Sequence, residues 1–182
     1  DHRDLHSFPT RRSSDLIDYI ENKDYAATNS MYSLLLALRA AKGPLWLLEG
    51  DVFFEGGILD IPPRGDLSWY ADSSTRHLDG AYLKEDEHGQ VVSLEIIRDL
   101  KLLSPGHHKS IGLLHLLPTG VKALTAWLEK GNSEGKCNLY YDLIVAEHLG
   151  EVPVDLVDVA GFKWFEIDTS EDLEAARRKF QI

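Results

Sequence analysis

The sequence is poor in cysteine and in long apolar runs. Among its 182 residues, Cys137 is the single cysteine, which excludes an intrachain disulfide and favours a reducing, cytoplasmic compartment. Nothing around Cys137 supports a role for it as a nucleophile. No apolar run approaches the ~20 residues that a transmembrane helix needs. We therefore expect a cytoplasmic protein without a membrane span.

Basic residues are also scarce. The 19 Lys and Arg stand against 30 Asp and Glu, which gives a formal net charge of −11. Because binding to a nucleic-acid backbone requires clustered cations, this deficit argues against a nucleic-acid partner. The excess of carboxylates has two interpretations: it increases solubility, and it suits a site that holds a divalent metal ion.

The first 16 residues differ from the rest of the chain. They lack apolar periodicity and the apolar core of a signal peptide. The run from His6 to Leu16 resembles a translated adapter sequence of the kind fused to metagenomic gene fragments. We therefore expect a non-native or disordered leader at 1–16, followed by one globular domain at 17–182 whose core draws on the chain's 43% hydrophobic content.

Beyond the leader, helix and strand patterns alternate. Apolar residues recur at helical spacing between Met31 and Leu38, after Thr28 or Asn29 as a cap. The continuously apolar run Leu45–Leu48 is typical of a strand buried on both faces. Further strands are predicted at 67–71, 80–84 and 90–97, with a loop at 60–66 and an acidic turn at 85–89.

The second half continues the alternation. A helix is predicted from Pro118 to Gly131, a second from 139 to 149, and strands at 154–159 and 162–168. Thr169 and Asp172 have the spacing of a capping box, so a last helix is expected to follow them. The whole pattern predicts a single α/β domain.

One candidate site follows the first predicted strand. Glu49-Gly50-Asp51 comes directly after Leu48, and ligands of open α/β sheets collect beyond the carboxyl ends of strands. A carboxylate beside a glycine at that place suits a bound metal ion or phosphate. An ordinary turn at the strand exit is the structural alternative.

A second candidate site is the segment from Trp164 to Asp168. The strand period places Glu166 and Asp168 on one face, where two neighbouring carboxylates repel unless a cation is close. A solvated edge strand is the alternative. Metal-assisted phosphoryl or nucleotidyl transfer needs carboxylates from separate strands, which connects this segment to Asp51.

A third group surrounds the predicted helix at 139–149. Asn138 is a suitable N-cap, and Tyr141 fits the core. In the functional interpretation, the tyrosines and Trp164, with Asp142 nearby, enclose an amine or quaternary ammonium head. Lys109 suits either phosphate neutralisation or an exposed, solvated position. The adjacent His107 and His108 lack the usual spacing of metal ligands.

Five segments in order resemble the bacterial phosphocholine cytidylyltransferases and related sugar-phosphate nucleotidyltransferases, which have a GT-A-like fold. They span roughly residues 17–182 and are Thr28-Asn29-Ser30-Met31-Tyr32-Ser33-Leu34, Leu48-Glu49-Gly50-Asp51-Val52, Lys109-Ser110-Ile111-Gly112, Asn138-Leu139-Tyr140-Tyr141-Asp142, and Trp164-Phe165-Glu166-Ile167-Asp168-Thr169 leading into Glu171-Asp172-Leu173. The resemblance implies a GT-A-like (Rossmann-like) α/β fold, a mixed sheet flanked by helices.

The resemblance also implies a reaction and its residues. A nucleoside triphosphate, CTP above others, donates a nucleotidyl group to a small phosphorylated acceptor such as phosphocholine, with Mg²⁺ as cofactor and pyrophosphate as by-product. Asp51 and Asp168 are implied as metal ligands and catalytic residues, supported by Glu166. The implied substrate side comprises Asn29, Lys109, Asn138, Tyr140, Asp142 and Trp164.

One departure from the family pattern accompanies these matches. The family begins with a strand and a glycine-rich, basic loop that grips the triphosphate, and neither is found here. We therefore expect a chain truncated at its N-terminus, with weak or no turnover. A glycosyltransferase of similar fold and a non-catalytic binding domain remain alternatives, as do sugar phosphate, inositol phosphate or aminoethylphosphonate as acceptors. The sequence does not indicate the oligomeric state.

Overall fold

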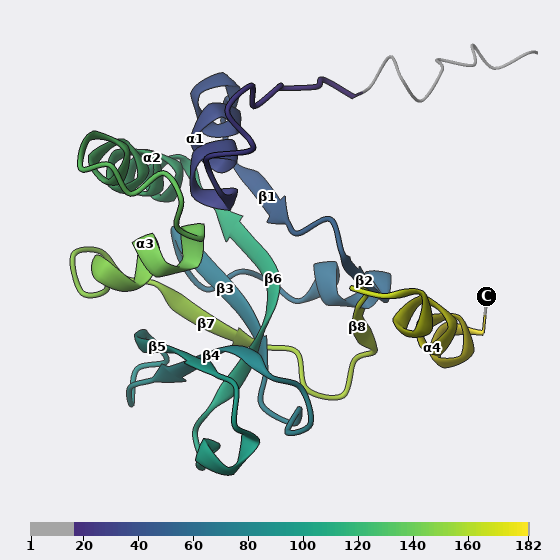
Figure 1. Cartoon of the computed structure of the whole chain (residues 1–182). Coiled ribbons are helices and arrows are strands. Elements are labelled where there is room, and N and C mark those ends of the chain that lie inside the picture. The colour runs from purple at the N-terminus through teal and green to yellow at the C-terminus, as the bar shows by residue number, and fades with distance from the viewer. Residues whose placement is uncertain (1–16, 182) are drawn as a thin grey trace, which may run out of the picture.

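The computed structural model describes residues 17–181, and the predicted leader at 1–16 lies outside them. A six-stranded mixed sheet forms the centre of this part of the chain (Figure 1). Five strands have the order β5-β4-β6-β3-β7, and β1 pairs with β6 as well. β3 and β7 run parallel, and the other pairs are antiparallel. The strands are β1 (Leu45–Leu48), β3 (Leu67–Asp72), β4 (Gly80–Glu85), β5 (Val91–Ile97), β6 (His108–Leu116) and β7 (Asp155–Asp158).

The nine-residue strand β6 organises this sheet. β3 pairs along one edge of β6, while β1 and β4 share the other edge. β1 pairs with residues 113–116 and β4 with residues 108–109, so residues 110–112 lie in a gap between the two partners. The sequence did not predict β6, because the buried polar residues at its start and Gly112 in its interior disguise the strand pattern.

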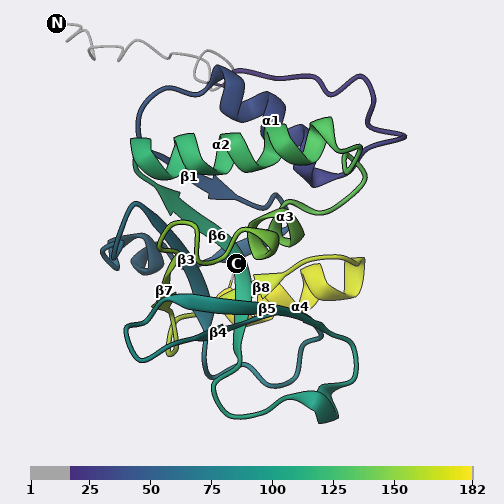
Figure 2. The ribbon, with the colours of Figure 1, turned by 90° about the vertical axis from the view of Figure 1, so that its left-hand side faces the viewer.

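Three helices cover one face of the sheet: α1 (Ser30–Ala40), α2 (Pro118–Ser133) and α3 (Tyr141–Glu147) (Figure 2). Alternate residues of β3, such as Leu67 and Trp69, point into the larger core that these helices form with the sheet. Between them, Tyr70 points to the opposite face, where it joins a second core. The sheet is thus buried on both faces along β3.

A small second unit covers the opposite face. β2 (Val52–Phe54) pairs antiparallel with β8 (Trp164–Glu166), and Trp164 packs in the second core with Tyr70. The 3₁₀ helix η2 (Gly56–Asp60) belongs to the same side, and η3 (Leu100–Leu102) lies in the β5–β6 connection. α4 (Ser170–Phe180) follows β8 and begins with the predicted capping box between Thr169 and Asp172.

Several expected boundaries and one burial pattern were wrong. β1 is an edge strand with Leu48 49% exposed, because its second edge has no partner among residues 17–181. α2 continues past Gly131, which is buried against Ile144 of α3. α3 begins at Tyr141, so Asn138 is not its N-cap. The mixed α/β sheet flanked by helices is confirmed, and no described helix is long and apolar enough to cross a membrane.

Candidate active site

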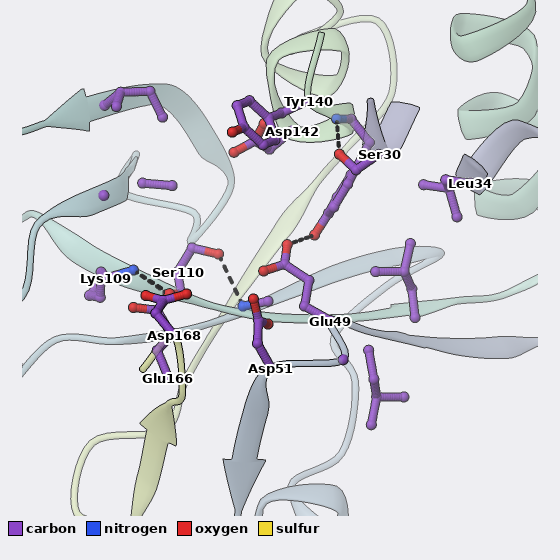
Figure 3. Close-up of a pocket in the computed structure, with 18 of the residues that line it drawn as sticks. Ser30, Leu34, Glu49, Asp51, Lys109, Ser110, Tyr140, Asp142, Glu166 and Asp168 are labelled. Carbon is purple, nitrogen blue, oxygen red and sulfur yellow. Dashed lines mark hydrogen bonds and ion pairs between the residues drawn. The ribbon is translucent and has the colours of Figure 1, made fainter. Parts of the chain in front are cut away.

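A pocket of about 630 Å³ lies where β1, β6 and β8 end or break their pairing, under the start of α3 (Figure 3). The gap at residues 110–112 of β6 contributes to its floor, since Ser110 and Gly112 line it. Six of the nine residues expected to bind metal or substrate line this pocket: Asp51, Lys109, Tyr140, Asp142, Glu166 and Asp168. Segments far apart in the chain therefore meet here, as the functional interpretation requires.

Pairing between β2 and β8 brings the two predicted metal ligands to the same pocket. Val52 is in register with Glu166, and the backbone N–H of Ile167 donates to the carbonyl of Asp51 at 2.8 Å. Asp51 and Asp168 thus flank one backbone hydrogen bond, and both are exposed and line the pocket. Both residues lie just outside the strands, and the pairing of β2 with β8 brings their backbones together.

Glu166 lies beside a buried cation. Its Oε1 accepts a hydrogen bond from Nζ of Lys109 at 2.9 Å, and the Lys109 side chain is only 3% exposed. The protein itself therefore supplies the cation next to Glu166. The alternative of an exposed, solvated Lys109 was wrong, since the side chain is enclosed by the β4–β6 region.

Glu49 also lines the pocket, although no role in catalysis or binding was predicted for it from the sequence. Its Oε1 accepts a hydrogen bond from the Tyr141 hydroxyl at 2.7 Å, and Tyr141 is buried. Burial raises the pKa of the Glu49 carboxyl above its ordinary value, while the Tyr141 hydrogen bond lowers it in part. The position of Glu49 directly after the strand Leu45–Leu48 is a signal visible in the sequence, but nothing in the sequence pairs Glu49 with Tyr141.

The rim of the pocket carries further charged and aromatic groups. Burial raises the pKa of the Asp142 carboxyl, and Tyr140 is exposed beside it at the start of α3. On the β4–β5 side, Arg98 donates to Asp79 at 2.7 Å. Sequence patterns alone did not place Arg98 and Asp79 at the site. Asp79 precedes β4 and Arg98 follows β5, and only the antiparallel pairing of these two strands brings both residues to the pocket.

The pocket is strongly acidic. Six carboxylates line it against two basic side chains, Arg98 and Lys109, and each of these bases is already paired with a carboxylate. Such a lining attracts cations and repels an unaccompanied triphosphate. A phosphate-bearing ligand therefore fits here most readily together with a divalent metal ion.

Three expected substrate-side residues lie elsewhere. Trp164 is 3% exposed in the second core, and its Nε1 donates to Asp72 at 2.8 Å. Asn29 caps α1, and its side chain accepts from the backbone N–H of Ser30. Asn138 is exposed ahead of α3 and is not among the pocket-lining residues. The structure therefore does not assemble a cage of Trp164 with the tyrosines.

The residues present fit a magnesium ion in one specific way. Within residues 17–181, no group of three or more His, Cys, Asp or Glu side chains is arranged as a complete metal cage. Mg²⁺ typically uses one or two carboxylates and completes its shell with waters and substrate phosphates. Asp51 and Asp168, exposed and next to two paired strands, meet that requirement, and their role as ligands stays a prediction.

No protein-family model matches the chain. A curated relative, CMP-5'-(3-aminopropyl)phosphonate synthase of Streptomyces rubellomurinus, is 28% identical over 90% of this chain. The alignment spans 27% of that relative, so the chain corresponds to about a quarter of its length.

Solved structures show the same fold. CTP:phosphocholine cytidylyltransferase from Streptococcus pneumoniae superimposes with a TM-score of 0.75 at 16% identity, covering 92% of this chain and 71% of that one. The inositol-1-phosphate CTP transferase from T. maritima gives 0.68 at 15% identity, covering 88% and 63%. The chain therefore has the GT-A-like fold of nucleotidyltransferases, and the resemblance predicted from its sequence is confirmed at that level.

Proposed function

Starting from this nucleotidyltransferase fold, we propose that the chain carries the metal- and acceptor-binding part of an enzyme that transfers a nucleotidyl group to a small phosphorylated acceptor. CMP from CTP is the proposed group, since three similar proteins are named for CMP or CTP. The observation that carries the proposal is the pairing of β2 with β8, which presents Asp51 and Asp168 to one pocket.

In the proposed reaction, an oxygen of the acceptor phosphate or phosphonate attacks the α-phosphorus of the nucleotide. A new P–O bond forms, the bond to the bridging oxygen of pyrophosphate breaks, and pyrophosphate leaves. Bound Mg²⁺ would supply neutralisation of the phosphate charge. Asp51 and Asp168 would hold it, and the pocket walls would align the acceptor, so that catalysis rests on positioning and charge neutralisation.

The acceptor proposed for this pocket has a cationic head. Glu49 and Asp142 offer carboxylates, and exposed Tyr140 offers an aromatic face. A primary ammonium group carries three N–H donors that match these oxygens, whereas a quaternary ammonium group relies on aromatic faces. With Trp164 committed to the second core, aminoalkyl phosphates or phosphonates suit the pocket better than phosphocholine.

A sugar or inositol phosphate is the second candidate acceptor. Carboxylates and the Tyr140 hydroxyl also bind neutral hydroxyl groups, and the similar structures include an inositol-1-phosphate CTP transferase. The excess of carboxylates over bases in the pocket favours the cationic acceptor over this alternative.

Pyrophosphate release tests the proposal. The complete gene product is incubated with CTP, Mg²⁺ and a panel comprising phosphoethanolamine, 2-aminoethylphosphonate, phosphocholine, inositol-1-phosphate and glucose-1-phosphate. We expect release that requires an acceptor, is fastest with an aminoalkyl acceptor, and is lost in Asp168→Asn. The control Asp60→Asn alters an exposed carboxylate outside the pocket and should retain activity. No release with any acceptor and any nucleoside triphosphate would overturn the proposal.

A further inference from the structure

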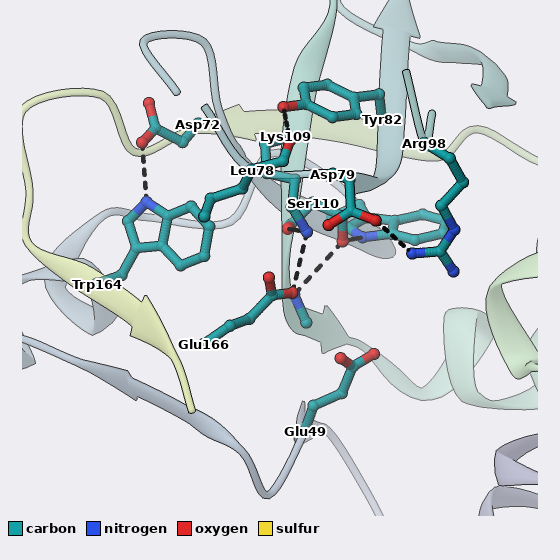
Figure 4. Close-up of polar contacts among 12 residues, drawn as sticks. Glu49, Asp72, Leu78, Asp79, Tyr82, Arg98, Lys109, Ser110, Trp164 and Glu166 are labelled. Atoms are coloured by element: carbon teal, nitrogen blue, oxygen red, sulfur yellow. Dashed lines mark hydrogen bonds and ion pairs between the residues drawn. The ribbon is translucent and has the colours of Figure 1, made fainter. Parts of the chain in front are cut away.

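Two polar contacts fasten β8 to the central sheet (Figure 4). At one end of β8, the Trp164 indole donates to Asp72, the last residue of β3, at 2.8 Å. At the other end, Glu166 accepts from Lys109 of β6 at 2.9 Å. Because β8 leads directly to Asp168, these contacts determine where the predicted metal carboxylate lies relative to the sheet.

Lys109 has little freedom to leave this contact. Its Nζ also lies 3.3 Å from the carbonyl oxygen of Ser110, and a Cβ placed on Gly80 would come within 3.0 Å of Nζ. Gly80 has φ +116°, so both its backbone conformation and this approach depend on glycine. A buried ammonium group needs such acceptors, since losing them leaves a desolvated charge unpaired. The side chain is thus held against Glu166.

Glu166 would otherwise compete for the metal ion. It ends β8 two residues before Asp168 and lines the same pocket as Asp51 and Asp168. A glutamate has the reach to join a coordination shell in that position. A third carboxylate on the ion would occupy a position that a substrate phosphate oxygen otherwise fills.

We propose that Lys109 is a positioning residue that keeps Glu166 out of the coordination shell of the divalent ion, which leaves Asp51 and Asp168 as the two carboxylate ligands. This inference rests on the metal site of the proposed function. In this proposal Lys109 binds Glu166 and does not bind a substrate phosphate. Glu166 binds Lys109 and does not coordinate the metal ion.

Manganese titrations in the absence of nucleotide test this assignment. Mn²⁺ affinity is measured by calorimetry for the wild type, Lys109→Met, Glu166→Gln and the double variant. Methionine keeps much of the apolar stem of lysine, and glutamine keeps an oxygen that accepts from Lys109. We expect Lys109→Met to bind Mn²⁺ about tenfold more tightly, since Glu166 becomes free to coordinate. Glu166→Gln alone should stay within about threefold of the wild type, because Glu166 is not a ligand there.

The double variant separates coordination from simple charge removal. Removing a nearby positive charge by itself would tighten Mn²⁺ binding equally whether residue 166 is Glu or Gln. Coordination by Glu166 predicts that the gain from Lys109→Met disappears, to within about threefold, when Glu166 is already Gln. An equal gain in both backgrounds, or no gain from Lys109→Met, would overturn the proposal.

Two further measurements keep the test decisive. If Lys109→Met does not fold, Glu166→Gln alone decides, because a loss of more than about tenfold in Mn²⁺ affinity would identify Glu166 as a ligand. Asp51→Asn and Asp168→Asn are titrated in parallel. If neither weakens Mn²⁺ binding, the metal site itself fails; if both do and the Lys109 cycle shows no coupling, only the positioning role fails.

Discussion

The backbone N–H of Ile167 donates to the carbonyl oxygen of Asp51 at 2.8 Å, and this contact places two distant carboxylates at one pocket. Asp51 directly precedes β2, and Asp168 lies two residues after the end of β8. Strand pairing has little conformational freedom, so the relative position of the two carboxylates is largely preset before a ligand binds. A fixed backbone arrangement of Asp51 and Asp168 favours a metal-binding site over a random cluster of acidic residues.

Gly112 is expected to be indispensable to the pocket wall. It lies inside β6 with φ +66°, and a Cβ there would come within 2.6 Å of Oε2 of Glu49. Gly112→Ala should lower the free energy of unfolding by about 1–3 kcal/mol, from backbone strain and displacement of Glu49. Urea denaturation measures this change. Gly56→Ala, where a Cβ meets nothing within 4 Å, is the control and should change stability by less than about 1 kcal/mol. Equal effects of the two substitutions would contradict the assigned role.

Glu49 should make stability depend on pH in a defined direction. Burial raises the pKa of this carboxyl, so above its ordinary pKa the folded chain retains a proton that the unfolded chain has lost. Ionisation at higher pH therefore reduces wild-type stability until the pH passes the raised pKa. Glu49→Gln removes this loss and still accepts from Tyr141, so its stability relative to the wild type should increase as the pH rises above about 4, the ordinary pKa of a glutamate.

Urea denaturation across this pH range, with EDTA present, provides the measurement. Glu87→Gln serves as the control, because the Glu87 side chain is 88% exposed in the acidic turn after β4. Its stability relative to the wild type should not follow pH in this way. A relative stability of Glu49→Gln that stays constant or decreases with pH would show that Glu49 ionises without penalty in the folded chain.

Trp164 and Tyr140 should affect different properties. Trp164→Phe removes the indole donor to Asp72 from the second core and should cost about 2–3 kcal/mol of stability. Its effect on acceptor affinity should stay below about threefold, since the ring lies outside the pocket. Tyr140→Ala should show the reverse, with little loss of stability and about tenfold weaker acceptor binding. Thermal unfolding and calorimetry with phosphoethanolamine and phosphocholine separate the two. If Trp164→Phe weakened acceptor binding as much as Tyr140→Ala, Trp164 would contribute to acceptor binding, as the aromatic cage predicted from the sequence requires.

Local sequence signals predicted the helices better than the central strand. α1 and α4 were found because capping residues and helical spacing are encoded within about a dozen neighbouring positions. β6 was missed because its identity comes from partners on both edges, and a buried lysine and an interior glycine conceal it. The start of α3 was misplaced by two residues, since Asn138 carries a capping signal that the structure does not use.

For the candidate site as well, the sequence predicted some residues and missed the contacts between them. Asp51, Glu166 and Asp168 were expected at one site because carboxylates near strand ends are visible in the sequence, and all three line the pocket. The predicted strand at 162–168 was too long, because β8 ends at Glu166, so the strand period does not relate Glu166 to Asp168. The partners of these residues were not predictable. The contacts of Lys109 with Glu166, Tyr141 with Glu49 and Trp164 with Asp72 join positions 57 to 92 residues apart. Such pairings depend on sheet order and register, which no single segment encodes.

Calorimetric titration of Mg²⁺ and Mn²⁺ into the wild type, Asp51→Asn, Asp168→Asn and the control Asp60→Asn tests the central claim most directly. We predict one binding site in the wild type and in Asp60→Asn, and a loss of at least about tenfold in affinity in each pocket variant, because each removes one of two carboxylate ligands. Wild-type affinity in both Asp51→Asn and Asp168→Asn would contradict the account.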